Sequence, residues 1–186
     1  MIAAFIEKSI IKNLADRALP IYLTHYDRQG FNEADVLGIS GAGLMYEYEI
    51  KVSRADFLAD FKNKQYKHLI LSRGEGVETY DKWVKGKHTD DTYELITLPN
   101  KFYFACPVGL IKLEDIPTYA GLVYIDDQGE YIEIKPAPFI HRAKANEIIY
   151  KSIAATLSER LVWGRAYRSH KLLQQKAKFE ELTITE

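Results

Sequence analysis

Residues 34–52 read ADVLGISGAGLMYEYEIKV, and this stretch decides the fold. Two short strand-like runs, 35–40 and 44–52, lie on either side of a Gly-Ala-Gly segment at 41–43. A short glycine-containing connection between two such runs is typical of a β-hairpin. We therefore predict two antiparallel strands joined by a tight turn.

The second of these strands divides its side chains into two sets. Neighbouring side chains of a strand point to opposite faces, so Glu47, Glu49 and Lys51 share one face and the aromatic and aliphatic side chains share the other. We expect the aromatic and aliphatic face to enter the core. The charged face is then either a solvated surface with a cross-strand salt bridge or a place for chemistry.

Outside the hairpin, the sequence predicts helices and further strands. Apolar residues recur at three- and four-residue intervals over 3–18 and over about 144–167, which indicates two amphipathic helices. Ser53 is suited to cap another helix that ends near Leu71. Further strands are predicted at 102–106, 121–125 and 130–135. The expected fold class is α/β, a mixed β-sheet flanked by helices with a long C-terminal helix.

We expect one domain over residues 1–186, with a core of about 1–140 and a basic helical C-terminal segment at 141–186. Residues 73–100 lose the helical periodicity and are predicted to form a long loop. The single cysteine, Cys106, lies in an apolar run and is expected to be a buried thiol. It favours a reducing compartment, and with no signal peptide or membrane span evident we expect a cytoplasmic protein.

Asp35, Glu49 and Lys51 together are suited to the hydrolysis of phosphodiesters. Asp35 begins the first hairpin strand, from which its carboxylate can lie beside Glu49. Mg²⁺ prefers oxygen ligands and usually takes one or two carboxylates together with water and a substrate phosphate. A lysine ammonium next to such a site stabilises the negative charge that grows in the transition state.

These residues resemble the signature of the PD-(D/E)xK nuclease superfamily, which has a restriction-endonuclease-like fold. Ala34-Asp35 is followed fourteen residues later by Glu49-Ile50-Lys51, with alanine where the family's variable proline can stand. The downstream sequence resembles the MmcB-like branch of that superfamily, which is found in DNA repair and in phages. The matching positions are Asp56, Phe57, Asp60, Lys62 and Tyr66, then the strand at 102–105, Pro107, Gly109 and residues 120–123.

The resemblance implies a metal-dependent DNA endonuclease that works through a metal-activated water. In that superfamily the acidic motif residues bind Mg²⁺, which Mn²⁺ can replace. Here these residues are Asp35 and Glu49, with the Ile50 carbonyl as a further ligand and Glu7 as a ligand from the first helix. Lys51 completes the catalytic set. The implied partner is DNA rather than a membrane, and the resemblance also allows a homodimer.

A second group of side chains is suited to contact DNA phosphates, with a solvated helix face as the alternative. Residues 142–178 contain nine basic residues against two acidic ones. The candidates are Lys62, Lys64, Tyr66, Arg142, Arg165 and Arg168. For Asp56 and Asp60, a role in helix capping competes with a place at the edge of the site. Each histidine is expected to be a surface residue or one whose hydrogen bonds are satisfied.

The overall charge excludes a uniformly basic nucleic-acid binder. The 186 residues include 25 Lys and Arg against 26 Asp and Glu, a formal net charge of -1. Because the basic residues gather near the C-terminus, this balance is compatible with a nuclease. It is equally compatible with a catalytically inactive DNA-binding or protein-interaction module on the same fold. We expect Glu49→Ala or Lys51→Ala to abolish cleavage and to leave the fold intact.

Overall fold

A computed structural model describes residues 2–27, 33–74 and 98–162 of the chain. The chain divides into two compact units, Met1–Ala145 and Asn146–Glu186. The second unit is helical over residues 147–162, within the predicted C-terminal helix. Among the described helices, none has both the length and the apolar character needed to cross a bilayer.

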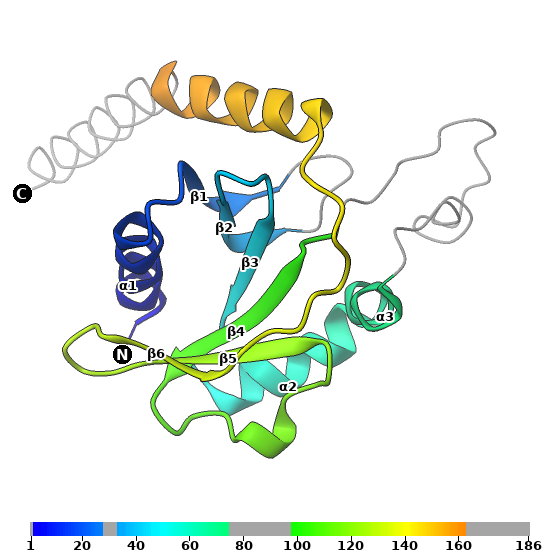
Figure 1. Ribbon diagram of the computed structural model, residues 1–186. Coiled ribbons are helices and arrows are strands. Elements are labelled where there is room, and N and C mark those ends of the chain that lie inside the picture. Colours follow the sequence, from blue (N-terminus) through cyan, green and yellow to red (C-terminus); the bar gives the residue numbers. More distant parts are fainter. Residues whose placement is uncertain (1, 28–32, 75–97, 163–186) are drawn as a thin grey trace, which may run out of the picture. The chain divides into compact units, whose positions relative to one another are not determined.

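A six-stranded sheet forms the centre of the first unit, with its strands in chain order (Figure 1). The strands are β1 (Ile21–Tyr26), β2 (Ala34–Ile39), β3 (Met45–Ile50), β4 (Lys101–Pro107), β5 (Ala120–Ile125) and β6 (Tyr131–Lys135). β1, β2 and β3 form an antiparallel meander, β3, β4 and β5 are parallel neighbours, and β6 returns antiparallel to β5. The predicted α/β fold class with a mixed sheet is confirmed.

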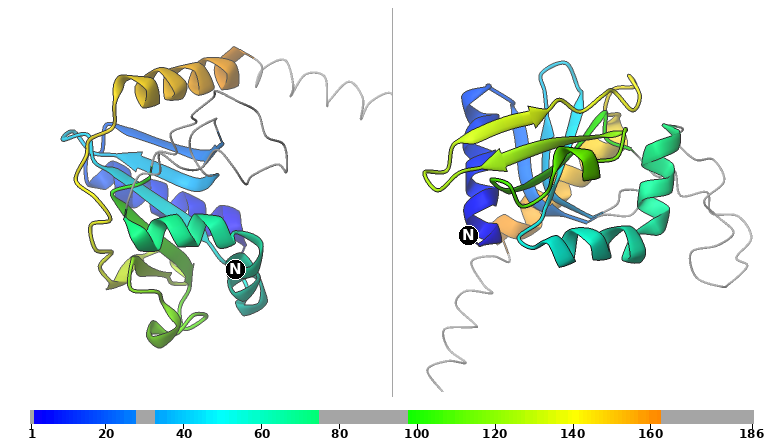
Figure 2. Two further views of the ribbon diagram at one scale, coloured as in Figure 1. Left: turned by 90° about the vertical axis from the view of Figure 1, so that its right-hand side faces the viewer. Right: turned by 90° about the horizontal axis from the view of Figure 1, so that it is seen from below.

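Helices cover both faces of this sheet, as Figures 1 and 2 show. Helix α1 (Ala3–Asp16) places Ile6, Ile10 and Leu14 in one core, against side chains such as Tyr48 and Ile50 of β3. Helices α2 (Arg54–Asn63) and α3 (Gln65–Arg73) cover the other face, where Phe57 and Ile70 join a core with Phe102 and Phe104 of β4. Alternation along β4 therefore supplies both cores, whereas β3 contributes to the first alone.

Three details differ from the sequence prediction. The sequence did not predict strand β1, in which Leu23 and Tyr26 are buried. The predicted helix that follows Ser53 is two helices, because Lys64 leaves helical geometry at φ -116° and ψ 37°. Of the two alternatives for the charged face of β3, the solvated surface is wrong, since Glu47, Glu49 and Lys51 are all buried.

Other predictions are confirmed or lie outside the described residues. The Ser53 hydroxyl accepts a hydrogen bond from the Asp56 N–H at 3.1 Å, so the predicted cap is present. Cys106 is fully buried, as expected, and burial raises the pKa of its thiol to about 11. Most of the predicted loop, residues 75–97, lies outside the described part of the chain.

The hairpin and the parallel pairing together position the charged residues. Asp35 lies one position beyond the Val36↔Tyr48 pair of β2 and β3, and so reaches the end of β3. On the other side of β3, Glu49 pairs with Phe104. The connection from β3 to β4 contains α2 and α3, which cover the sheet face from which the Glu49 side chain projects. The motif residues therefore meet the two helices at one end of the sheet.

Candidate active site

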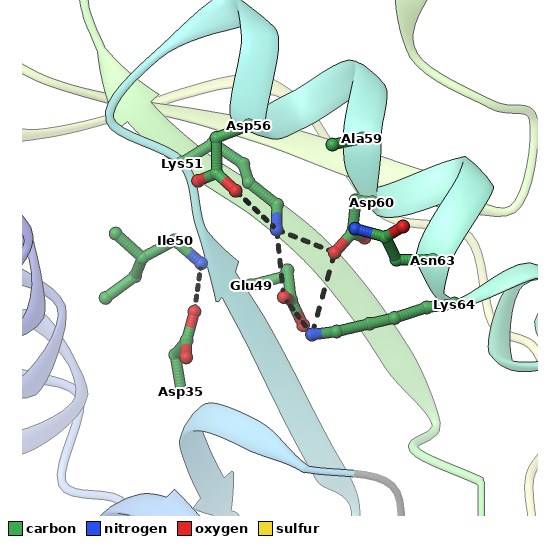
Figure 3. Close-up of a pocket in the computed structure, with 9 residues that line it drawn as sticks. All are labelled: Asp35, Glu49, Ile50, Lys51, Asp56, Ala59, Asp60, Asn63 and Lys64. Carbon is green, nitrogen blue, oxygen red and sulfur yellow. Dashed lines mark hydrogen bonds and ion pairs between the residues drawn. The ribbon is translucent and has the colours of Figure 1, made fainter.

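A cavity of about 270 Å³ lies where the end of β3 meets α2 (Figure 3). Strand β2 contributes one carboxylate, β3 and the residue after it contribute the motif, and α2 and its C-terminal end close the other side. The nine lining residues are Asp35, Glu49, Ile50, Lys51, Asp56, Ala59, Asp60, Asn63 and Lys64. The three predicted catalytic residues are thus brought to one cavity.

Asp35 is fixed by the backbone of the strand next to it. Its Oδ2 accepts a hydrogen bond of 2.7 Å from the N–H of Ile50. Burial raises the pKa of Asp35, and repulsion by Glu49 raises it further, although the bond from Ile50 opposes both. A carboxylate has about four lone-pair sites, so Asp35 keeps acceptor capacity for another ligand.

Glu49 is 2% exposed and is surrounded by ammonium groups. Its Oε1 accepts from Lys51 Nζ at 3.0 Å and from Lys64 Nζ at 2.6 Å, and its Oε2 accepts from Lys67 Nζ at 2.8 Å. Burial opposes ionisation, but Lys67, Lys51 and Lys64 outweigh it and hold the pKa of Glu49 below its usual value. Glu49 is therefore an ionised carboxylate in a buried position.

Lys51 lies between two carboxylates. Its Nζ donates to Glu49 at 3.0 Å and to Asp60 at 2.7 Å, and it lies 4.0 Å from Asp56. Burial would lower the pKa of Lys51, but the two carboxylates reverse this and raise it. An ammonium has three N–H donors, so these two hydrogen bonds leave one donor for a group in the cavity.

A chain of hydrogen bonds continues from Lys51 into the core. The other oxygen of Asp60 contacts His68 Nε2 at 2.8 Å, and His68 Nδ1 contacts the Tyr119 hydroxyl at 2.7 Å. Burial favours the neutral acid at Asp60, but bonds from His68 and Lys51 outweigh it and lower its pKa. Asp60 therefore orients Lys51, which supports the prediction that it belongs to the edge of the site. His68 is satisfied, as predicted.

Glu47 and Lys67 form a second buried layer on the same face. Lys67 Nζ lies 2.6 Å from Glu47 Oε1, without hydrogen-bond geometry, and also donates to the carbonyl of Glu33 at 2.9 Å. Burial raises the pKa of Glu47 to about 7 against the attraction of Lys67. Each of these side chains is at most 3% exposed, so neither lies on the surface of the protein.

The remaining predicted residues that the structure describes do not line the cavity. Glu7 lies on α1, where its carboxylate contacts His25 Nε2 at 3.1 Å. Lys62 is exposed on α2, and Tyr66 packs partly buried against the second core. Arg142 lies over the ring of Phe139, 4.3 Å from its centroid. Arg165 and Arg168 lie outside the described residues.

The carboxylates at the cavity are ligands of the kind that a hard divalent cation prefers. Asp35 and Glu49 bring carboxylates to the lining of the cavity and Ile50 lines it too, and Mg²⁺ takes few protein ligands and keeps several waters. No group of three or more His, Cys, Asp or Glu side chains arranged to hold a metal occurs among the described residues. Glu49 also already carries three ammonium contacts. A cation there would compete with these ammonium groups for the same carboxylate.

The comparisons with known proteins bear on the fold alone. No protein-family model matches the chain, and no curated protein matches it. A solved structure, the SPO1766 protein of unknown function from Silicibacter pomeroyi, is similar with a TM-score of 0.50 and 20% sequence identity. The match covers 82% of this chain and 88% of that one. The chain therefore shares an overall fold with a protein whose function is itself unknown.

Proposed function

We propose that this protein is a Mg²⁺-dependent DNA endonuclease of the PD-(D/E)xK type. The observation that carries the proposal is the convergence of Asp35, Glu49 and Lys51 on one cavity at the end of β3. Residues fourteen positions apart in the sequence meet there because the hairpin folds β2 back along β3. Charges on a solvated strand face are not expected to line one cavity, nor to include a carboxylate that is fixed by a backbone N–H as Asp35 is.

The residues take distinct parts in this reaction. Asp35, Glu49 and the Ile50 carbonyl would hold Mg²⁺, which when bound lowers the pKa of a water and neutralises charge on the phosphate. The remaining N–H of Lys51 is available to orient that water and to stabilise the charge that develops on phosphorus-bound oxygens. Asp60 holds Lys51 in place at 2.7 Å. Glu7 is given no part in this proposal, because it does not line the cavity and its carboxylate contacts His25.

One observation favours a second candidate, a catalytically inactive DNA-binding or protein-interaction module. Glu49, with its three ammonium contacts, is charge-balanced without any metal. Such a network is also what a purely structural site would contain. The two candidates agree on the fold and differ on whether DNA is cut.

A cleavage assay on linear duplex, single-stranded and branched DNA separates them. The nuclease predicts product with Mg²⁺ or Mn²⁺ and none with a chelator. An inactive DNA-binding module predicts salt-dependent retention of DNA with no product under any metal. A protein-interaction module predicts no salt-dependent affinity for DNA at all. Either of the last two results would overturn the proposal.

A further inference from the structure

Lys64 differs from the other two lysines that contact Glu49. The side chains of Lys51 and Lys67 are 4% and 3% exposed, whereas that of Lys64 is 33% exposed. Lys64 Nζ lies 2.6 Å from Glu49 Oε1 and 3.6 Å from Asp60 Oδ1 (Figure 3). Its ammonium therefore sits between two cavity carboxylates and still reaches solvent.

The position of Lys64 in the chain allows this side chain to leave. Lys64 is the residue at which α2 ends and α3 begins, and its backbone N–H donates to the Asp60 carbonyl at 2.7 Å. The backbone is thus fixed, while the four-carbon side chain extends from a helix junction into the cavity. The ammonium can move to water without disturbing either helix.

Departure of Lys64 would leave Glu49 still paired. Lys51 and Lys67 each keep their contact with Glu49, at 3.0 and 2.8 Å. Asp60 likewise keeps Lys51 and His68, at 2.7 and 2.8 Å. Lys51 and Lys67 are held in turn by Asp60 and Glu47. Of the three cations on Glu49, Lys64 is therefore the one that a ligand can displace most easily.

A divalent cation bound to Glu49 would meet Lys64 directly. Both bind the same carboxylate, and like charges a few ångströms apart repel strongly where solvent is restricted. Lys64 Nζ lies between the carboxylates of Glu49 and Asp60. A divalent cation in the cavity would favour the same place. A metal ion on Glu49 and Lys64 at its present position would therefore oppose each other.

We propose that Lys64 is an internal competitor for the metal: it occupies Glu49 in the metal-free protein and is released to solvent when a divalent cation binds. This inference rests on the proposed metal site and adds a residue that sets its affinity. It makes binding of the metal a measurable exchange of one cation for another. By linkage, anything that holds Lys64 away from Glu49 strengthens metal binding.

Affinity for Mn²⁺ alone, measured by calorimetry on the full chain, tests the exchange. Lys64→Gln removes the competing charge, and we expect it to bind Mn²⁺ about tenfold more tightly than the wild type does. Lys62→Gln is the matched control, because Lys62 is exposed in the last turn of α2 and does not line the cavity. Its affinity for Mn²⁺ should equal that of the wild type.

Acylation of lysine amines in the wild-type chain gives a second readout that needs no variant. Mn²⁺ should raise the rate at which Lys64 is modified, as measured by mass spectrometry of peptides, and should leave the rate at Lys62 unchanged. Equal Mn²⁺ affinities for wild type and Lys64→Gln, or no change in the rate at Lys64, would overturn this inference while the metal site stands. If Mn²⁺ does not bind, or binds Asp35→Asn as well as wild type, then the metal site and the inference both fail.

Discussion

Glu49→Gln tests the electrostatic account of the site, because it removes one charge and almost no volume. The wild-type side chain is 3% exposed and accepts from Lys51, Lys64 and Lys67. Removing one partner of a buried ion pair costs about 3–5 kcal/mol, since the other charge is left uncompensated. In this variant Lys51 keeps its contact with Asp60, and Lys67 keeps its contact with Glu47. The expected loss of unfolding free energy is therefore at the lower end of that range, about 3 kcal/mol.

Urea denaturation followed by far-ultraviolet circular dichroism measures this loss. With a urea dependence of about 2 kcal/mol/M, a loss of about 3 kcal/mol lowers the transition midpoint by about 1.5 M. The control is Glu114→Gln, because Glu114 is 76% exposed and its contact with Lys112 is 3.5 Å long. Its unfolding free energy should change by less than about 0.5 kcal/mol. A loss below about 1 kcal/mol for Glu49→Gln would refute the reasoning.

The burial of Glu49 and Lys51 changes the expectation drawn from the sequence that their substitution leaves the fold intact. The unfolding free energy of a domain is about 5–15 kcal/mol, so the loss expected for Glu49→Gln is a large part of the total. Loss of cleavage in a Glu49 variant therefore reports on catalysis only if that variant is shown to be folded at the assay temperature.

Other predictions concern the two cores. Burial raises the pKa of Cys106 from 9.0 to about 11, so the folded state keeps a proton that the unfolded state loses above pH 9. Unfolding free energy should thus fall between pH 9 and 11 more steeply in wild type than in Cys106→Ala; parallel curves would contradict this. A methyl group at Gly121 would overlap the ring of Tyr103 and lie 2.7 Å from the backbone nitrogen of Ala137. Gly121→Ala should therefore lower the melting temperature, and an unchanged value would argue against this packing. Phe104 is fully buried, and Phe104→Ala should cost about 3–5 kcal/mol in urea denaturation, with a loss under about 1 kcal/mol as the contrary result.

Local signals were enough to predict the hairpin and the motif. The Gly-Ala-Gly turn set the register that brings Asp35 to the end of β3, and the two-residue period placed Glu49 and Lys51 on one face. Both features depend on residues close together in the chain. Strand β1 was missed because its buried positions, Leu23 and Tyr26, do not alternate with period two.

The second layer of the site could not be predicted, because it depends on contacts made by the folded chain. Lys67 pairs with Glu47 and Glu49, about twenty residues away, only once α3 packs on the sheet. The link from His68 to Tyr119 spans 51 residues. A sequence signal did exist for Lys67, since three lysines at 62, 64 and 67 follow a strand with two glutamates on one face. Lys64 and Lys67 both contact Glu49, whereas Lys62 is exposed.

Cleavage of DNA by wild type and Asp35→Asn tests the central claim most directly. Asparagine keeps the volume of the side chain and an oxygen that can accept from the Ile50 N–H. The carboxylate that it replaces is disfavoured in its charged form, because burial and repulsion by Glu49 raise the pKa of Asp35. The variant should therefore remain folded, which circular dichroism checks. Wild type should give product with Mg²⁺ and none with a chelator, and Asp35→Asn should cut DNA at a rate lower by about 100-fold or more. Equal rates for the two proteins, or no product from folded wild type with Mg²⁺ or Mn²⁺ on any DNA, would contradict it.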